Sequence, residues 1–293
     1  MFKGIITAIV TPFKSGEVDW DAFAALIERQ IAAGIHGLVV SGTTGESPTL
    51  SKEEKKRLFQ FAVERVKGRT ALIAGTGSNN TADSVEFSKW AANLKVDGLL
   101  TVVPYYNKPT QEGMYQHFAA IAKAVTPMPI VLYNVPSRTV ADLLPETIAR
   151  LATISNVTCV KEATGKMERI TEILRLAPHL SVLSGDDGTF FDGMQNGMRG
   201  VISVASNVFP KPMVELYNHF VAGDRERAES LNGALAELYS ILFCETSPAP
   251  VKEAATYLGW MMNEVRLPLV PISDANKLKL YRVIESFKVQ FGA

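Results

Sequence analysis

Few residues in this chain are of the kinds that mark disulfide-bonded or metal-binding proteins. Among its 293 residues only Cys159 and Cys244 are cysteines, with no CxxC pair and no histidine near either one in the sequence. A disulfide framework and a zinc site built from neighbouring residues are therefore not indicated. The four histidines lie in unrelated segments, so we expect no metal site. A chain with so little cysteine fits a reducing cytoplasm.

The chain also lacks net charge and long apolar runs. Its 30 basic residues balance 30 acidic ones, and without a basic cluster we expect neither nucleic acid nor an anionic membrane as a partner. No run approaches the roughly 18 to 20 apolar residues that span a bilayer. The amino-terminal apolar run is interrupted by Thr7, Thr11 and Pro12, which favours a first strand over a signal peptide.

What the chain does contain is a repeated alternation of short β-branched runs with amphipathic segments. Hydrophobic residues make up 47% of the chain and charged residues 20%, which is enough apolar material for a large globular core. The alternation is typical of βαβ units around a parallel sheet. Eight runs are present, at residues 4–10, 37–40, 71–75, 98–103, 130–133, 157–160, 181–183 and 200–203.

Eight strands are the number that closes a barrel, whereas an open doubly wound sheet usually stops at five or six. We therefore predict an α/β fold, a (β/α)8 TIM barrel over residues 1–223. Residues 224–293 are predicted to form a carboxyl-terminal helical extension packed on the same domain, with breaks at Pro248, Pro250, Pro268 and Pro271. Helices are expected at residues 19–33, 52–66, 82–94, 111–124 and 145–151, with Ser51 and Thr81 as amino-terminal caps.

In a barrel of this kind the active site lies at the carboxyl ends of the strands. Lys161 directly follows the apolar run 157–160. A lysine drawn partly out of water loses its proton more readily and can attack a carbonyl. An ion pair with Glu162 at the strand end is an equally open interpretation. The other segments that follow strands are SGTTGES at 41–47, GTGSNN at 75–80, PYYNKP at 104–109, YNVPSRT at 133–139 and SGDDG at 184–188.

Other polar side chains in these segments also suit carbonyl chemistry. Tyr133 could move a proton at a bound carbonyl, and the hydroxyls of Thr43 and Thr44 could extend a proton path. Arg138 offers a fork suited to a carboxylate. Taken singly, each has a plainer interpretation as a packed aromatic, a turn or a surface cation. Adjacent carboxylates such as those of SGDDG usually cap a helix or face solvent, and GTGSNN lacks the spacing of a nucleotide-binding loop.

The segments GTTGE, PYYNKP, YNVPSRT, KEATG and SGDD occur in the order and spacing that resemble the dihydrodipicolinate synthase family, also called 4-hydroxy-tetrahydrodipicolinate synthase. The resemblance extends from the first strand to LFCETSPAPVKEAA near the carboxyl end. It implies a lyase of lysine and diaminopimelate biosynthesis. Pyruvate would form a Schiff base with Lys161, and the derived enamine would attack L-aspartate 4-semialdehyde. The resemblance implies no cofactor, because the imine itself is the electron sink.

The resemblance also implies roles for individual residues. Tyr133 would be the general acid and base, and Thr44 with Tyr106 would complete a proton relay, Tyr106 reaching the neighbouring subunit's site. The chain would then be a homo-oligomer, a tetramer made of two dimers. Thr43 and the amide of Thr44 would hold the pyruvate carboxylate and Arg138 that of the semialdehyde. Gly185 and Ile202 would contribute carbonyl contacts around Lys161.

The sequence departs from the family pattern in two places. Members inhibited by lysine commonly have histidines in the helix after GTTGES, where this chain has Lys52 and Lys55, and Pro48 follows Ser47. We therefore expect weak or absent inhibition by lysine, although residues that match the effector pocket remain at Ser47, Asn79, Asp83 and Tyr105. The segment ETSPAPVK has Ser247 and Ala249 where Asn and Ile are usual. We expect it to lie away from the chemistry.

Two alternatives stay open from the sequence. The first is a sister aldolase that also uses a pyruvate imine, such as N-acetylneuraminate lyase or a 2-keto-3-deoxy-sugar-acid aldolase. Arg138 within YNVPSRT, and the PYYNKP segment, favour the synthase. The second is a barrel that has lost catalysis and binds pyruvate as a sensor, which the complete set of reactive side chains argues against.

Overall fold

Eight parallel strands form a closed barrel in this computed structural model, which describes residues 1–292. The order around the barrel is β1-β10-β9-β8-β7-β6-β5-β4, which confirms the predicted (β/α)8 class. The strands are β1 (Gly4–Ala8), β4 (Gly37–Val40), β5 (Ala71–Gly75), β6 (Gly98–Val102), β7 (Ile130–Asn134), β8 (Val157–Glu162), β9 (Ser181–Ser184) and β10 (Gly200–Ser203). A small hairpin of β2 (Phe13–Lys14) and β3 (Glu17–Val18) was not predicted.

The barrel strands are short and almost wholly buried because parallel strands are covered on both faces. Every residue of β7, with the sequence IVLYN, is buried. That burial explains why the strands read in the sequence as continuous apolar runs. The structure extends three strands beyond their predicted ends, β7 to Asn134, β8 to Glu162 and β9 to Ser184.

Helices connect the strands, and their bounds follow the amphipathic segments closely. Ser51 caps α2 in a capping box with Glu54, as its position predicts. The expected cap Thr81 is wrong, because the side chain of Asn80 accepts from the amides of Ala82 and Asp83 and caps α3. The helices are α1 (Trp20–Ala32), α2 (Lys52–Val66), α3 (Thr81–Ala92), α4 (Gln111–Val125), α5 (Pro136–Thr139), α6 (Pro145–Leu151), α7 (Met167–Leu176), α8 (Phe190–Gln195), α9 (Pro210–Val221), α10 (Arg225–Ile241), α11 (Ala249–Tyr257) and α12 (Asp274–Phe291).

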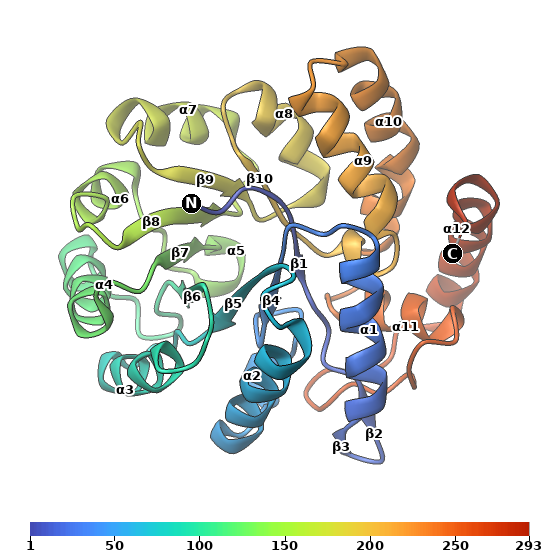
Figure 1. Ribbon diagram of the computed structural model, residues 1–293, viewed down its shortest axis with the longest axis horizontal. Helices are drawn as coiled ribbons and strands as arrows, with labels where there is room; N and C mark the ends of the chain where they lie inside the picture. Colours follow the sequence, from blue (N-terminus) through green and yellow to red (C-terminus); the bar gives the residue numbers. More distant parts are fainter. Residues whose placement is uncertain (293) are drawn as a thin grey trace. The chain divides into compact units, whose positions relative to one another are not determined.

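The chain divides into two compact units. The first contains residues 1–4 and 71–202; in it the helices α3, α4, α6 and α7 lie outside the strands β5 to β9 (Figure 1). The second contains residues 5–70 and the chain from 203 onward. A boundary of the barrel at residue 223 stays a prediction.

The carboxyl-terminal segment is helical as expected. In the second unit α10 packs against α9 and α12, and α11 packs against α12 and the 3-10 turn η3 (Ala205–Asn207). Pro248 precedes α11, but Pro250 lies within its first turn and does not break it, because the first turn of a helix tolerates proline. Within residues 1–292 no helix combines the length and the apolar character that crossing a membrane requires.

Candidate active site

Lys161 and Tyr133 lie side by side at the carboxyl ends of two neighbouring strands. They are paired in the register between β8 and β7, and the Nζ of Lys161 lies 4.1 Å from the centre of the Tyr133 ring. Lys161 is 6% exposed and Tyr133 is 5% exposed. An amine that is largely removed from water beside a phenol can act as a nucleophile with a proton donor and acceptor at hand.

Glu162 does not serve as the counter-ion of Lys161. Its carboxylate accepts from the Nε of Arg169 at 3.0 Å and from the amide of Thr164 at 2.9 Å. Successive side chains of a strand point to opposite faces, so Glu162 and Lys161 leave β8 in opposite directions. No ion pair found in residues 1–292 includes Lys161, and the alternative interpretation of a Lys161–Glu162 pair is therefore wrong.

Gly185 follows β9 and lies against the side chain of Lys161. Its amide donates to the carbonyl of Glu162 at 2.8 Å. A Cβ atom at this position would come within 3.0 Å of the Lys161 Cε and 2.6 Å of the Ala163 Cβ. A glycine is therefore needed here for the lysine to keep its place. Ile202, the other residue expected nearby, is buried in β10.

Arg138 lies on α5, a single helical turn that directly follows β7. The amide of Arg138 donates to the carbonyl of Val135 at 2.9 Å, and Pro136 starts the turn. The side chain is exposed. Because α5 begins two residues after the end of β7, Arg138 lies on the same side of the sheet edge as Tyr133, where a fork for a carboxylate was expected.

The PYYNKP loop presents Tyr106 to solvent in a strained conformation. The side chain is 86% exposed, and its φ of +73° is rare for a residue with a side chain. Two asparagines hold the loop: Asn107 Nδ2 donates to the carbonyl of Asn79 at 2.9 Å, and Asn79 Nδ2 donates to that of Tyr105 at 3.2 Å. The structure therefore brings Asn79 and Tyr105 together, as expected for two of the effector-pocket residues. Asp83 lies in the exposed first turn of α3.

In the second unit the GTTGES segment forms a tight loop after β4. Thr44 is buried and Thr43 partly so, and the Thr11 hydroxyl donates to the carbonyl of Gly45 at 2.7 Å. Glu46 has a φ of +55°, a conformation that persists in a non-glycine residue only where its surroundings enforce it. Ser47 starts the 3-10 turn η1 (Ser47–Thr49).

The side chain that holds this loop comes from the carboxyl-terminal extension. The Nζ of Lys252 on α11 binds the carboxylate of Glu46 and, at 2.9 Å, the carbonyl of Thr11. The side chains of both Lys252 and Glu46 are fully buried. Burial lowers the pKa of Lys252, and the Glu46 carboxylate opposes that shift. The expectation that ETSPAPVK lies away from the chemistry stays a prediction, but the segment does more than pack, because its Lys252 holds Glu46 of the GTTGES loop.

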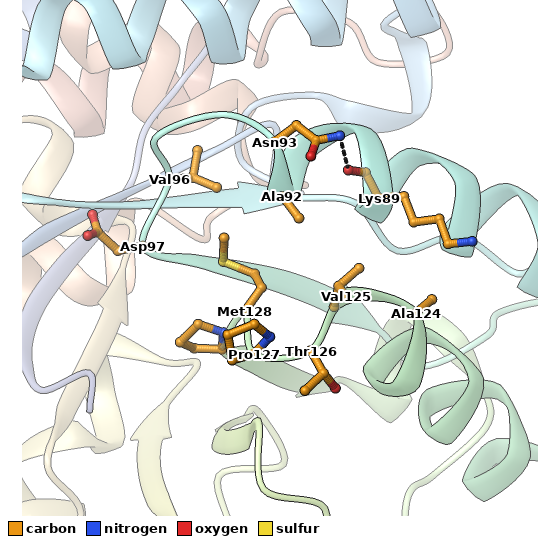
Figure 2. A pocket seen from close by; sticks show the side chains of 11 residues that line it. Lys89, Ala92, Asn93, Val96, Asp97, Ala124, Val125, Thr126, Pro127 and Met128 are labelled. Atoms are coloured by element: carbon orange, nitrogen blue, oxygen red, sulfur yellow. Dashed lines mark hydrogen bonds between the residues drawn. The ribbon is translucent and has the colours of Figure 1, made fainter.

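A cavity of about 550 Å³ lies at the other end of the first unit's strands. Its lining comes from the segments that precede β6 and β7, and Figure 2 shows Val96, Val125 and Met128 between Lys89 and Asp97. Asp97 accepts from the amide of Leu72 at 2.7 Å. The amino-terminal face of a barrel serves stability rather than chemistry, so this cavity is not the active site. Among residues 1–292 no group of three or more His, Cys, Asp or Glu is placed to hold a metal ion.

The barrel and the buried lysine beside a tyrosine at its strand ends define a class of enzyme, one that bonds covalently to a carbonyl substrate. The chain belongs to the dihydrodipicolinate synthetase family, whose model matches residues 1–287.

Similar proteins cover almost the whole chain. It is 50% identical over 289 residues to the 4-hydroxy-tetrahydrodipicolinate synthase of Syntrophobacter fumaroxidans, covering 98% of this chain and 99% of the relative. It is 48% identical to that of Geotalea daltonii, covering 99% and 100%. Among solved structures, dihydrodipicolinate synthase from Aquifex aeolicus is similar with a TM-score of 0.96 and 45% identity, covering 98% of each chain. The expected family is confirmed.

Proposed function

We propose that this protein condenses pyruvate with L-aspartate 4-semialdehyde to give 4-hydroxy-tetrahydrodipicolinate, in lysine and diaminopimelate biosynthesis. The observation that carries the proposal is the position of the Lys161 amine, buried without a counter-ion and 4.1 Å from the Tyr133 ring. The names of its relatives support the choice of substrates. We place the protein in the cytoplasm, because a chain with two cysteines fits a reducing compartment.

The chemistry begins with attack of the neutral Lys161 Nζ on the keto carbon of pyruvate. Loss of water gives a protonated imine, which draws electrons from the adjacent methyl group and makes its proton acidic. Removal of that proton yields an enamine, whose carbon attacks the aldehyde of the semialdehyde. The amine of the second substrate then closes the ring by displacing Lys161, which returns to its starting form.

The remaining residues are assigned by the family pattern and by their local chemistry. Tyr133 moves protons at the imine, and Thr44 and Tyr106 connect it to solvent. Thr43 and the amide of Thr44 hold the pyruvate carboxylate, and Arg138 holds that of the semialdehyde. The carbonyls of Gly185 and Ile202 contact the bound substrate around Lys161.

A coupled assay with both substrates tests this function against its nearest rival. The proposed synthase turns over pyruvate with aspartate semialdehyde and does not cleave N-acetylneuraminate. Cleavage of N-acetylneuraminate or of a 2-keto-3-deoxy sugar acid, without turnover of the semialdehyde, would instead identify a sister aldolase. Binding of pyruvate without turnover of either kind would identify a sensor.

We further propose that the protein works as a homo-oligomer, a dimer of dimers in which Tyr106 completes the partner subunit's site. The exposed, strained Tyr106 supports this, because an aromatic side chain held outward at a positive φ is suited to a surface contact. One similar solved protein is a monomeric dihydrodipicolinate synthase variant. Sedimentation of this chain at micromolar concentration decides between the assemblies.

Removing only the Tyr106 hydroxyl is expected to slow turnover by about tenfold or more, because a member of a proton relay is lost. In Tyr106→Phe the melting temperature and the pyruvate adduct on Lys161 should stay as in the wild type. Tyr115→Phe is the matched control, since Tyr115 on α4 uses its ring to contact Arg150. Equal turnover in the Tyr106 and Tyr115 variants would remove Tyr106 from the relay.

Lysine at millimolar concentration is expected to inhibit the enzyme weakly or not at all. Lys52 and Lys55 on α2 carry the charge of the ligand's own ammonium, and a like charge at about 4 Å costs about 1 kcal/mol even in water. An inhibition curve is the measurement, with Lys52→His/Lys55→His as the companion variant expected to bind lysine about fivefold or more tightly. Strong cooperative inhibition of the wild type would contradict the prediction.

A further inference from the structure

A cluster of four polar side chains, of which Asn134 and Glu162 are fully buried, lies on the opposite face of β7 and β8 from Lys161 and Tyr133. Its members are Asn134, Asp142, Glu162 and Arg169, and we call it the Arg169 network. The Arg169 guanidinium binds both oxygens of Asp142, at 2.8 and 3.0 Å, and reaches Glu162 with its Nε at 3.0 Å. Asn134 Nδ2 donates to Asp142 at 2.9 Å and to Glu162 at 3.1 Å.

The Arg169 network joins the segments that carry the active side chains. Asn134 and Glu162 are paired in register, one residue after the Tyr133 and Lys161 pair. The Asn134 side-chain oxygen accepts from the amide of Leu143 at 2.9 Å. The network thus fixes the ends of both strands and the segment that follows α5.

The network also carries net charge beside the strand that holds Lys161. Asn134 and Glu162 are at most 1% exposed, and the Arg169 side chain is 11% exposed. Two carboxylates face one guanidinium, which leaves a formal charge of minus one; Asp142 is 38% exposed, so solvent screens it, whereas the buried Glu162 carboxylate is screened weakly. Glu162 directly follows Lys161 in β8, so it is the charged member of the network nearest to the lysine along the chain.

We propose that Arg169 and Glu162 are positioning residues that tune Lys161: Arg169 fixes the Glu162 carboxylate on the opposite face of β8 and offsets its charge. The proposal deepens the proposed function and rests on it for the role of Lys161. Removing Arg169 and removing Glu162 should therefore shift the pH dependence of Lys161 reactivity in opposite directions, although the two residues are partners in one ion pair.

Other ionisable groups on the elements around β8 stay unchanged in the test. They include Tyr133 on β7, Arg138 on α5, Asp186 and Asp187 after β9, Lys166 and Glu168 at the start of α7, and Glu172 further along α7. Because they are common to every variant, differences between variants report the Arg169 network alone.

The test measures the pH at which Lys161 becomes half reactive, by trace labelling with acetic anhydride and mass analysis of the peptide that contains it. Glu162→Gln removes an anion and should lower this midpoint by about one pH unit, whereas Arg169→Met removes a cation and should raise it by about as much. The double variant restores the net charge and should return the midpoint close to the wild-type value. Arg169→Lys keeps the charge and should do the same.

Arg175→Met is the matched control, because Arg175 lies on the same helix in an exposed pair with Glu172; its midpoint should not move. The proposal is overturned if the midpoints of Glu162→Gln and Arg169→Met move in the same direction or do not move. A network with a purely structural role would not shift the two midpoints in opposite directions. If Arg169→Met does not fold, the proposal is tested by two other results: a lowered midpoint in Glu162→Gln, and a midpoint close to the wild-type value in the double variant.

The labelling does not depend on pyruvate, so failure of the proposed function is recognised separately. If the wild type forms no pyruvate adduct but the variants show opposite shifts, the role of the Arg169 network stands and the proposed reaction is refuted. If the wild type forms the adduct but the variants show no opposite shifts, the proposed reaction stands and the role of the Arg169 network is refuted.

Discussion

Replacing Lys161 with alanine is expected to lower turnover by about 10³-fold or more, because loss of the covalent nucleophile removes the reaction path. The fold should persist, since Lys161 forms no ion pair in the described chain and its Nζ lies over the Tyr133 ring rather than in a polar network. A truncated side chain also leaves Gly185 and the Glu162 contacts in place. The measurement is the coupled rate with both substrates, together with a melting curve.

Lys166→Ala is the control for this prediction, because Lys166 is an exposed lysine five residues along the same segment. It should keep full activity. Residual turnover of Lys161→Ala within tenfold of the wild type would mean that another amine, or no amine, carries the chemistry.

Replacing Lys252 with methionine is expected to cost about 3–5 kcal/mol in the free energy of unfolding, because it leaves the Glu46 carboxylate buried without a partner charge. The amide of Arg266 would still donate to Glu46, at 2.9 Å, but a neutral donor does not replace the lost ammonium. The loss should also raise the KM for pyruvate, since Glu46 lies in the loop that carries Thr43 and Thr44. Denaturant unfolding and a pyruvate titration measure the two effects.

The double variant Lys252→Met/Glu46→Gln should regain much of the lost stability, because neither charge then remains buried. Lys56→Met supplies the comparison with a surface pair: Lys56 binds Glu53 on the solvent-facing side of α2, and its loss should change stability by about 0.5 kcal/mol or less. A cost for Lys252→Met as small as that for Lys56→Met would show that the buried pair does not hold the loop.

The sequence predicts the barrel well because its strands are buried on both faces and therefore stand out as apolar runs. The sequence does not predict the ends of strands at which polar residues are buried. Asn134 and Glu162 end β7 and β8 but were left outside the predicted strands. Their burial depends on Arg169 and Asp142, which no local pattern links to them.

In the candidate site, too, local patterns identify some residues, whereas others depend on contacts between distant parts of the chain. Lys161, Tyr133 and Arg138 could be found because each follows an apolar run, at the end where a barrel places its chemistry. Lys252 could not, because 206 residues separate it from Glu46 and its segment reads as an ordinary amphipathic helix. The strain at Tyr106 was equally hidden, since a positive φ in a non-glycine residue leaves no mark in composition.

The most direct measurement is reduction of the protein with borohydride in the presence of pyruvate, followed by mass analysis of its peptides. We expect one pyruvate-derived adduct for each chain, on the peptide that contains Lys161, and none in Lys161→Ala. An adduct on a different lysine, or none under conditions in which the enzyme turns over, would contradict the Schiff base at Lys161.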